Sequence, residues 1–363
     1  MQSPLDFPPL TKAVIPGDKV VLAMDTDFPE PGPVVKMIYE QLAAAGVHPE
    51  DITLIQEERP DADLIDPRAD LPSEIREAVH WMRHKPDDAD ACRYLATTTG
   101  GERIYLAGCV VDADVVVTLG QMSFDPLLGF RGTHSVFYPG LSNREAHLRS
   151  RGQGHGELTP EHDRPWRQLI DEIGWLVGTQ FTVQVIPAIQ GGVARVLAGS
   201  AESVLREGKL ILRDLWSCQL EERADLVVAA IESSSPGQGW HSLGAVLGCT
   251  RNLVARDGKI LILTNLNEAP GEGVQMVRGH REPADAIQTL RAEAPTDLIT
   301  ATELALATDW ANVYLMSDLP GDLVEDLFMI PIENQREAAR VIEGENSCVF
   351  LDSAQFVHGS ISG

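Results

Sequence analysis

The chain has 363 residues, enough for two domains, and with 44% hydrophobic and 23% charged residues its composition excludes wholesale disorder. The 54 acidic side chains outnumber the 29 basic ones, and a net charge of −25 argues against nucleic-acid or anionic-membrane partners. There are five scattered cysteines, no apolar run long enough to span a bilayer and no pattern of a signal peptide. We therefore expect a cytoplasmic protein with no membrane and no nucleic-acid partner.

Strands and helices are predicted to alternate along the first half of the chain. Short apolar runs indicate strands, and apolar residues at helical spacing indicate helices. The predicted strands span 20–24, 52–55, 103–106, 114–119 and 181–186, and the predicted helices span 33–45, 71–83 and 165–177. Such alternation is typical of a parallel sheet covered by helices.

Residues 120–156 differ from this pattern, because they are rich in glycine and show little periodicity. A loop of that length within a compact domain is usually functional. Regular patterning resumes near residue 165, and the segment 189–192 resembles a hinge.

The second half repeats the alternation of strands and helices. Predicted strands span 226–231, 259–263, 313–316 and 348–351, and predicted helices include 201–212, a helix ending at 254, 283–292, 298–307 and one near 322. The expected fold class is therefore α/β, with two domains (1–190 and 191–363) whose mainly parallel sheets face a central cleft. Open parallel sheets bind ligands at the carboxyl ends of their strands, so a small molecule is expected in that cleft.

A serine- and glycine-rich loop follows the predicted strand 226–231 and precedes a helix. Its Ser234 and Gly237 place free backbone N–H groups where a phosphate or carboxylate can bind, although an ordinary capped turn has the same composition. The spacing is not that of a dinucleotide fingerprint, and no P-loop lysine follows.

Histidines suggest two further hypotheses. His80 and His84 lie four apart on the predicted helix 71–83, where they form either a metal pair or a solvated face. Four more histidines fall in or just beyond the glycine-rich loop, and neutral imidazoles are good ligands for nickel or zinc and good proton shuttles. They are His134, His147, His155 and His162.

Two carboxylates, Asp25 and Asp27, follow the first predicted strand. Catalytic carboxylates often occupy such positions, and the same residues also cap turns and helices. Both interpretations of this pair remain open.

With these residues in view, the sequence resembles the nickel-dependent lactate racemase family. The stretch HKPDDADACRYLATTTGGERIYLAGCVVDADVVVTLGQ (84–121) is similar to the family's run "lGtT.rGtpv.vn..v.eADlvi.iG". The loop LLGFRGTHSVFYPGLSNREAH (127–147) is similar to "aGfsGGaKailPG", and MDTDFPEPGPV (24–34) stands where the family carries "DD.TRPTP".

This resemblance implies two α/β domains and an isomerase that interconverts the stereoisomers of a 2-hydroxy acid. It also implies a nickel-pincer nucleotide as cofactor, tethered through a lysine, with nickel held partly by a histidine. His147 or His155 is the candidate for that nickel ligand, and we expect Asp125, Arg131, His134 and Ser135 to line the cleft.

The chain departs from the family pattern at several of the implied site positions. The tethering lysine aligns with Ser135, and residues 86–208 contain no lysine at all. The two proton-transfer histidines align with Asp125 and with Glu57 or Glu58, and the substrate-binding arginine aligns with Phe28. Because a carboxylate can replace an imidazole as a base, Asp125 and Glu57 are the catalytic candidates.

Two functions follow from this resemblance. One is a 2-hydroxy-acid racemase or epimerase fold that works without the standard lysine-tethered cofactor. The alternative is a non-catalytic small-molecule-binding or regulatory protein that keeps the cleft. The coordinated replacement of Ser135, Asp125, Glu57 and Phe28 favours the alternative.

Overall fold

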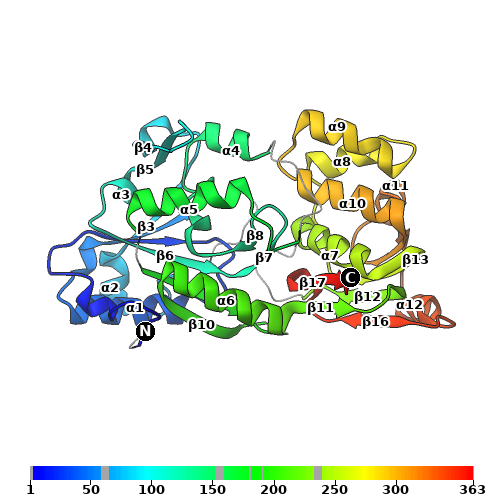
Figure 1. Cartoon of the computed structure of the whole chain (residues 1–363), viewed down its shortest axis with the longest axis horizontal. Coiled ribbons are helices and arrows are strands. Elements are labelled where there is room, and N and C mark those ends of the chain that lie inside the picture. The colour runs from blue at the N-terminus through cyan, green and yellow to red at the C-terminus, as the bar shows by residue number, and fades with distance from the viewer. Residues whose placement is uncertain are drawn as a thin grey trace. The chain divides into compact units, whose positions relative to one another are not determined.

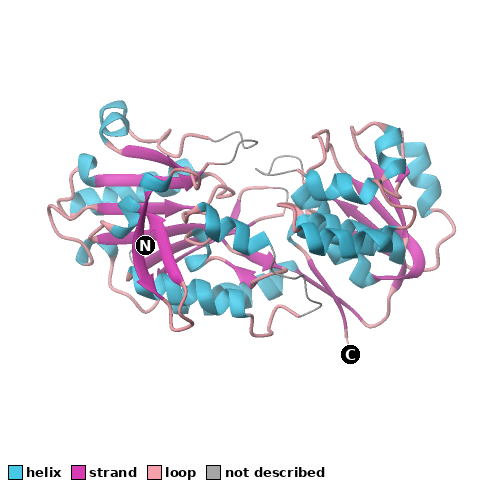
Figure 2. Ribbon diagram, turned by 90° about the horizontal axis from the view of Figure 1, so that it is seen from above, coloured by secondary structure: helices cyan, strands magenta, loops and turns pink. Residues whose placement is uncertain are grey.

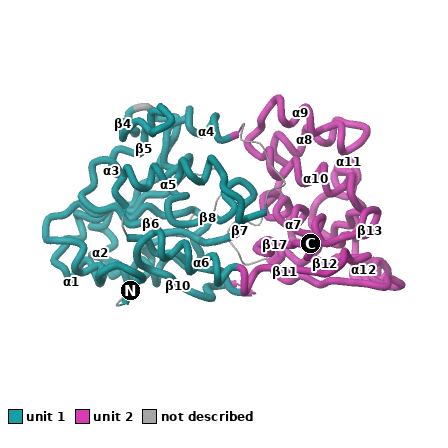
Figure 3. The backbone as a smooth tube through the Cα atoms, in the orientation of Figure 1, with its two compact units in different colours: residues 1–150, 157–188, 192–212 teal, residues 151–156, 189–191, 213–363 magenta. Residues whose placement is uncertain are grey.

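The computed structural model describes residues 3–58, 65–151, 159–179, 181–189, 191–232 and 239–362. The chain divides into two compact units, each described here by itself (Figure 3). Unit 1 comprises 1–150, 157–188 and 192–212, and unit 2 comprises 151–156, 189–191 and 213–363. In the part of the chain that the structure describes, no helix is both long and apolar enough to cross a bilayer.

A mainly parallel sheet forms the centre of unit 1 (Figures 1 and 2). Its strand order is β10-β9-β6-β1-β2-β3; only β10 runs antiparallel to its neighbour. The bounds are β1 (Val20–Met24), β2 (Ile52–Glu57), β3 (His80–His84), β6 (Val115–Gln121), β9 (Phe181–Pro187) and β10 (Val193–Ser200).

Both faces of this sheet are covered by helices, because alternate side chains of each strand point to opposite faces. On one face, Leu22 of β1 packs in a cluster with Ile38 of α1 (Pro31–Ala44). On the other face, Ala23 of β1 packs in a cluster with Ile170 of α5 (Pro165–Val177). Figure 1 shows α1 and α5 on opposite sides of the strands.

The remaining elements of unit 1 are short strand pairs and helices. The hairpin β7–β8 directly follows β6, and the 3-10 helix Thr133–Val136 follows the hairpin. The bounds are β4 (Cys92–Thr97), β5 (Arg103–Ala107), β7 (Ser123–Asp125), β8 (Gly129–Arg131), α2 (Ser73–Ala78), α3 (Gly108–Val111), α4 (Arg144–Arg151) and α6 (Ala201–Trp216), whose last residues belong to unit 2.

Unit 2 is built on a parallel sheet of order β15-β14-β13-β12-β16, with β11 and β17 paired separately. One face packs mainly against α7 and α10, and the other packs against α12. The strands are β11 (Ser217–Leu220), β12 (Ala224–Ala230), β13 (Val254–Leu263), β14 (Asn312–Met316), β15 (Ile330–Pro331), β16 (Cys348–Leu351) and β17 (His358–Ile361). The helices are α7 (Trp240–Leu253), α8 (Glu272–Arg278), α9 (Ala286–Glu293), α10 (Leu298–Trp310), α11 (Gly321–Asp326) and α12 (Gln335–Ile342).

The predicted α/β class with mainly parallel sheets is confirmed. One predicted element is wrong: the helix expected over 71–83 is the shorter α2 followed by strand β3. Val79 turns extended, and His80 pairs with Thr53 of β2. Pairing with the edge of β2 overrides the local helical spacing, so His80 and His84 do not form a helical metal pair.

The glycine-rich segment is also more ordered than its composition predicts. Gly120 and Gln121 end strand β6, and the segment then contains β7, β8, a 3-10 helix and α4. Strands β3, β4 and β10 were not predicted from the sequence either. Strand β10 was missed because its pattern, VARVLAGS, mixes exposed and buried positions and ends in small residues.

Candidate functional site

The candidate site lies at the point where the strand order of unit 1 reverses. The chain runs from β1 to β2 and β3 on one side and continues through β6 and β9 on the other. Open α/β sheets bind ligands at such switch points, outside the carboxyl ends of the strands. Asp25 and Thr26 follow β1 there, Glu57 ends β2, and the hairpin β7–β8 extends from β6.

These segments enclose a pocket of about 240 Å³. It combines three carboxylates, one guanidinium and two aliphatic hydroxyls with an apolar wall that contains two aromatic rings. This is the composition expected of a small-molecule site. Its lining residues are Met24, Asp25, Thr26, Glu57, Asp125, Leu127, Leu128, Arg131, Ser135, Val136, Tyr138, Pro139, Gly140, Trp166 and Ile170.

Arg131 binds Asp25 through two parallel hydrogen bonds. Its Nε donates to Asp25 Oδ2 at 3.0 Å and its Nη2 donates to Oδ1 at 2.7 Å. The Asp25 side chain is only 4% exposed, and Asp27 Oδ2 lies 4.0 Å from the same guanidinium. The charge of Asp25 raises the pKa of Arg131 still further, so this cation is permanently charged and held by a fork-shaped contact.

Glu57 projects from the end of β2 toward the loop that carries Gly140. A Cβ atom at Gly140 would lie 3.1 Å from Glu57 Oε2, so glycine lets the carboxylate approach the backbone closely. Glu57 Oε1 lies 3.9 Å from Nδ1 of His147 on α4. The sequence-predicted base and the candidate metal histidine are therefore neighbours.

Asp125 ends strand β7 and caps the turn that follows. Its Oδ1 accepts hydrogen bonds from the backbone N–H groups of Leu127 and Leu128, both at 2.8 Å. Arg164 reinforces the turn by donating from Nη1 to the carbonyl of Pro126 at 2.6 Å. The second oxygen, Oδ2, receives no hydrogen bond from the residues that the structure describes.

Two hydroxyls complete the polar part of the pocket. Ser135 Oγ accepts a hydrogen bond from the backbone N–H of Gly132 at 3.0 Å and so fixes the turn before it. Thr26 Oγ1 is buried and has no hydrogen-bond partner within the described part of the chain. A buried hydroxyl without a partner carries a desolvation cost that a ligand can relieve.

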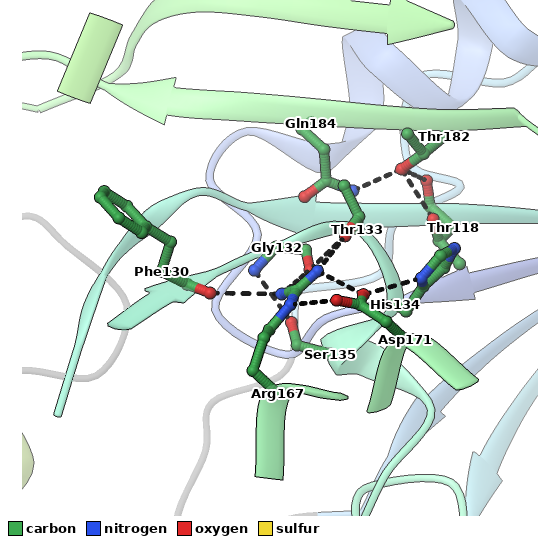
Figure 4. A network of polar contacts seen from close by, with 10 residues as sticks. All are labelled: Thr118, Phe130, Gly132, Thr133, His134, Ser135, Arg167, Asp171, Thr182 and Gln184. Atoms are coloured by element: carbon green, nitrogen blue, oxygen red, sulfur yellow. Dashed lines mark hydrogen bonds and ion pairs between the residues drawn. The ribbon is translucent and has the colours of Figure 1, made fainter. Parts of the chain in front are cut away.

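Behind the pocket, a network on α5 holds the segment that carries Arg131 and Ser135 (Figure 4). The Arg167 guanidinium contacts Asp171 at 2.7 and 2.9 Å and donates to the Phe130 and Gly132 carbonyls at 3.2 Å and to Thr133 Oγ1 at 2.9 Å. This contact also supports a strained turn, because Thr133 has a positive φ of 54°.

His134 belongs to that network and does not line the pocket. Its Nδ1 lies 3.1 Å from Asp171 Oδ1, and its ring packs against Gly174 so closely that a Cβ there would lie 2.2 Å from His134 Cγ. Bonds from His134 and Arg167 outweigh burial and lower the pKa of Asp171. These contacts give His134 a structural role, which its position in the glycine-rich loop did not indicate.

Of the residues singled out in the sequence, Asp25, Glu57, Asp125, Arg131 and Ser135 share the pocket. Phe28, at the position of the family's substrate arginine, is buried in the core at 3% exposure. Ser234, Gly237 and His155 lie outside the described residues, and among those described no group of three His, Cys, Asp or Glu side chains is placed to hold a metal.

Sequence reasoning missed several residues of the site, namely Thr26, Tyr138, Trp166, Arg167 and Asp171. The last two stand four apart on a well-predicted helix, and that spacing alone predicts an Arg–Asp pair. Nothing in the sequence indicates that this pair binds a loop more than thirty residues earlier in the chain. The Arg131–Asp25 contact joins residues 106 positions apart and carries no sequence signal either.

The fold is that of an open α/β protein with a pocket at the switch point of its first sheet. Residues 1–152 match the family model of the lactate racemase N-terminal domain. The lactate racemase apoprotein from Thermoanaerobacterium thermosaccharolyticum aligns with 100% of this chain and 91% of its own length, at a TM-score of 0.81 and 16% identity. The predicted resemblance to lactate racemases is thereby confirmed.

A second solved structure, a Thermotoga maritima protein from the Northeast Structural Genomics Consortium, aligns with 97% of this chain and 96% of its own length. Its TM-score is 0.68 and its identity is 15%. No curated protein matches the chain. At such identities the two structures show a shared fold and not a shared activity.

Proposed function

We propose that this protein binds a small polar molecule in the unit 1 pocket and does not carry a lysine-tethered nickel-pincer nucleotide. The observation that carries the proposal is the pairing of Arg131 with Asp25 beside Ser135. Arg131, the only cation among the described lining residues, is already bound to a carboxylate. Ser135, at the tether position, carries a hydroxyl in place of an amine.

The residues present do not fit the tethered cofactor. A lysine amine is required for the family's attachment, and Ser135 Oγ instead accepts the Gly132 N–H. The described lining residues include no lysine. An amine close to this segment belongs to Lys209 of α6, whose Nζ lies 4.9 Å from the centroid of the Phe130 ring. That position supports a cation–π contact with the hairpin.

Intact mass after co-expression with the cofactor-making enzymes tests the absence of a tether. The calculated mass of the chain is expected, and an excess of a few hundred daltons would contradict the proposal. Lys209→Met is the informative second variant, because loss of such an excess in that variant would assign the attachment to this amine.

Binding itself is tested by thermal shift with a panel of hydroxy acids, hydroxy amides, amino alcohols and nucleotides. A ligand present at a hundred times its Kd adds about 2.7 kcal/mol of stability. Ser135→Leu, which fills the pocket, is expected to abolish the shift while the far-ultraviolet circular dichroism stays unchanged. A shift that survives in Ser135→Leu would place binding elsewhere, and no shift with any compound would contradict a binding function.

A second candidate function is an isomerase of 2-hydroxy acids that works with carboxylate bases. The contact between Glu57 and His147 favours it, because a carboxylate beside an imidazole can accept and pass on a proton. Chiral quantification of D-lactate formed from L-lactate separates the two candidates. We expect no turnover by the wild type or by Ser135→Lys, because residues that act as a unit are not restored one at a time.

A further inference from the structure

We infer that the unit 1 pocket binds a neutral polyol, such as a pentitol or a hexitol, through ligand hydroxyls that both donate and accept hydrogen bonds. The inference rests on the proposed binding function and names its ligand class. It starts from three lining residues, Thr26, Asp125 and Arg131. Each keeps one polar group without a hydrogen-bond partner among the residues that the structure describes, and the three groups differ in what they offer to a ligand.

Arg131 provides the donor. Its Nε and Nη2 donate to the carboxylate of Asp25, whereas Nη1 donates to none of the residues that the structure describes. A guanidinium has more N–H groups than this contact uses, so donors remain for a ligand after the pair has formed. Because the carboxylate of Asp25 offsets the positive charge, the remaining N–H groups need only a neutral oxygen as acceptor.

Asp125 provides the acceptor. Its Oδ1 accepts from two backbone N–H groups of the turn that follows it, and Oδ2 receives no hydrogen bond within the described part of the chain. Asp25 has the largest effect in raising the pKa of Arg131, and the charge of Asp125 adds to it. At Arg164, Asp125 opposes the fall in pKa that burial causes. An ammonium group beside Asp125 would therefore be repelled by guanidinium charge as well as attracted by the carboxylate.

Thr26 provides a group that both donates and accepts. Its Oγ1 is buried and has no hydrogen-bond partner in the described chain. A hydroxyl has a donor and two acceptor lone pairs, and burying it unpaired costs free energy. A ligand hydroxyl next to Thr26 would recover that cost in either direction of the hydrogen bond.

These three groups together favour hydroxyls over charged groups. A carboxylate only accepts, so it would leave Asp125 without a donor and bring two negative charges together. An ammonium only donates, so it would leave Arg131 without an acceptor. Neighbouring hydroxyls of a polyol can donate to one group and accept from another, and hydrogen bonds in such chains strengthen each other.

The apolar part of the lining fits the carbon skeleton of such a ligand. Tyr138 and Trp166 belong to this wall, with ring centroids 5.4 Å apart. The Tyr138 hydroxyl donates to Glu102 at 2.9 Å, so this residue offers the pocket its ring. An apolar wall removes the C–H groups of a polyol from water, and a volume of about 240 Å³ admits one short polyol.

Calorimetric titration of the full chain with neutral polyols tests the inference. The probes are ribitol, xylitol, sorbitol and mannitol, followed by the aldonate and the 1-amino-1-deoxy derivative of the tightest binder. The two derivatives place a negative or a positive charge on the same skeleton. At pH 8 unperturbed imidazoles are neutral, so the comparison reports the groups described above. We expect at least one polyol to bind, about tenfold more tightly than either charged derivative.

Thr26→Val tests the buried hydroxyl, because valine keeps the shape of the side chain. It is expected to weaken binding of the polyol about fivefold, whereas Thr26→Ser, which keeps a hydroxyl, should stay within about twofold of the wild type. The stability of the unliganded chain should not fall in Thr26→Val, because no hydrogen bond to a described residue is lost.

Asp125→Asn tests the acceptor. Asparagine keeps Oδ1 for the turn and replaces the other oxygen by an amide nitrogen, which cannot accept. We expect polyol binding to weaken about tenfold. Glu40→Gln, at an exposed position of α1, removes the same charge and should leave the affinity unchanged.

The outcomes separate the ligand class from the binding function. If none of the polyols binds, the inferred class is wrong, and the binding function is decided by the broader thermal-shift panel. Equal or tighter binding of either charged derivative also overturns the class and leaves a binding protein. The same holds if a polyol binds equally to the wild type, Thr26→Val and Asp125→Asn, because other groups would then hold it.

Discussion

Two arginines at the same short segment of unit 1 contact different groups. Arg131 lies on the pocket side and binds Asp25, whereas Arg167 lies behind the segment and binds Asp171. Arg167 also donates to two carbonyls and a threonine hydroxyl of the segment, so its fork holds backbone (Figure 4). Arg131 instead binds the carboxylate of Asp25, which lines the pocket, and lies 4.0 Å from that of Asp27.

This contrast separates structural from binding roles. Behind the segment, hydrogen bonds join a helix to a turn. Removing one partner of such a bond leaves the other buried polar group without a hydrogen bond. On the pocket side, Thr26 Oγ1 and Asp125 Oδ2 receive no hydrogen bond from the described residues. Groups of that kind are available to a ligand, which is why we place binding on this side.

The largest expected effect comes from breaking the rear network with Arg167→Met. The change removes the fork to Asp171 and leaves two carbonyls and the left-handed turn at Thr133 unsupported. We expect a loss of about 3 kcal/mol in the free energy of unfolding, measured by urea denaturation. Arg167→Lys should recover only part of it, since lysine lacks the fork. A loss no larger than that of the exposed control Arg195→Met would contradict the assigned role.

Breaking the Arg131–Asp25 pair with Asp25→Asn should lower the free energy of unfolding by less than Arg167→Met does. Asparagine keeps one acceptor for the guanidinium, and Asp27 stands 4.0 Å from Arg131 as a second carboxylate. A loss of about 2 kcal/mol is expected from the same denaturation experiment. If Asp25→Asn proved more destabilising than Arg167→Met, the front pair would be the main support of the segment and the comparison would be reversed.

Gly174→Ala probes the packing of the rear network without removing a charge. In most helices this replacement stabilises by up to about 1 kcal/mol, but here the new Cβ would lie 2.2 Å from His134 Cγ. We expect a net loss of about 1–2 kcal/mol. Gly208→Ala on α6 is the matched control, because its Cβ meets the flexible end of Met122, and it should cost less. Similar thermal midpoints for the two variants would argue against a tightly packed His134.

The smallest effect at neutral pH is expected from His84→Gln at the edge of the sheet. His84 is buried, and its Nε2 donates to the Ser142 carbonyl at 2.7 Å. Burial is the main cause that lowers the pKa of His84, so the unfolded chain binds more protons at this site than the folded chain does. Stability should therefore fall as the pH drops below about 6.5, and the variant should show a shallower fall. Identical pH profiles of unfolding would contradict this account.

Much of the fold is predictable from the sequence, because buried strands such as VVLAM and helices such as 165–177 have strong periodic patterns. Strand β3 was not predictable from HWMRH alone, since its conformation depends on pairing with β2. Five residues of the pocket were named from the sequence: Asp25 from its place after the first strand, and Glu57, Asp125, Arg131 and Ser135 from the resemblance. Their partners required three-dimensional contacts that join residues far apart in the chain.

The measurement that tests the central claim most directly compares binding of 2-hydroxy-4-methylpentanoate with that of its amide in the wild type and in Asp25→Asn. In our account Asp25 occupies the carboxylate-binding face of Arg131, so the wild type should prefer the amide. Removing the charge of Asp25 should leave the guanidinium without its main counter-charge and improve binding of the anion by about tenfold relative to the amide. An unchanged ratio of the two affinities in Asp25→Asn would contradict the claim that this pair determines what the pocket accepts.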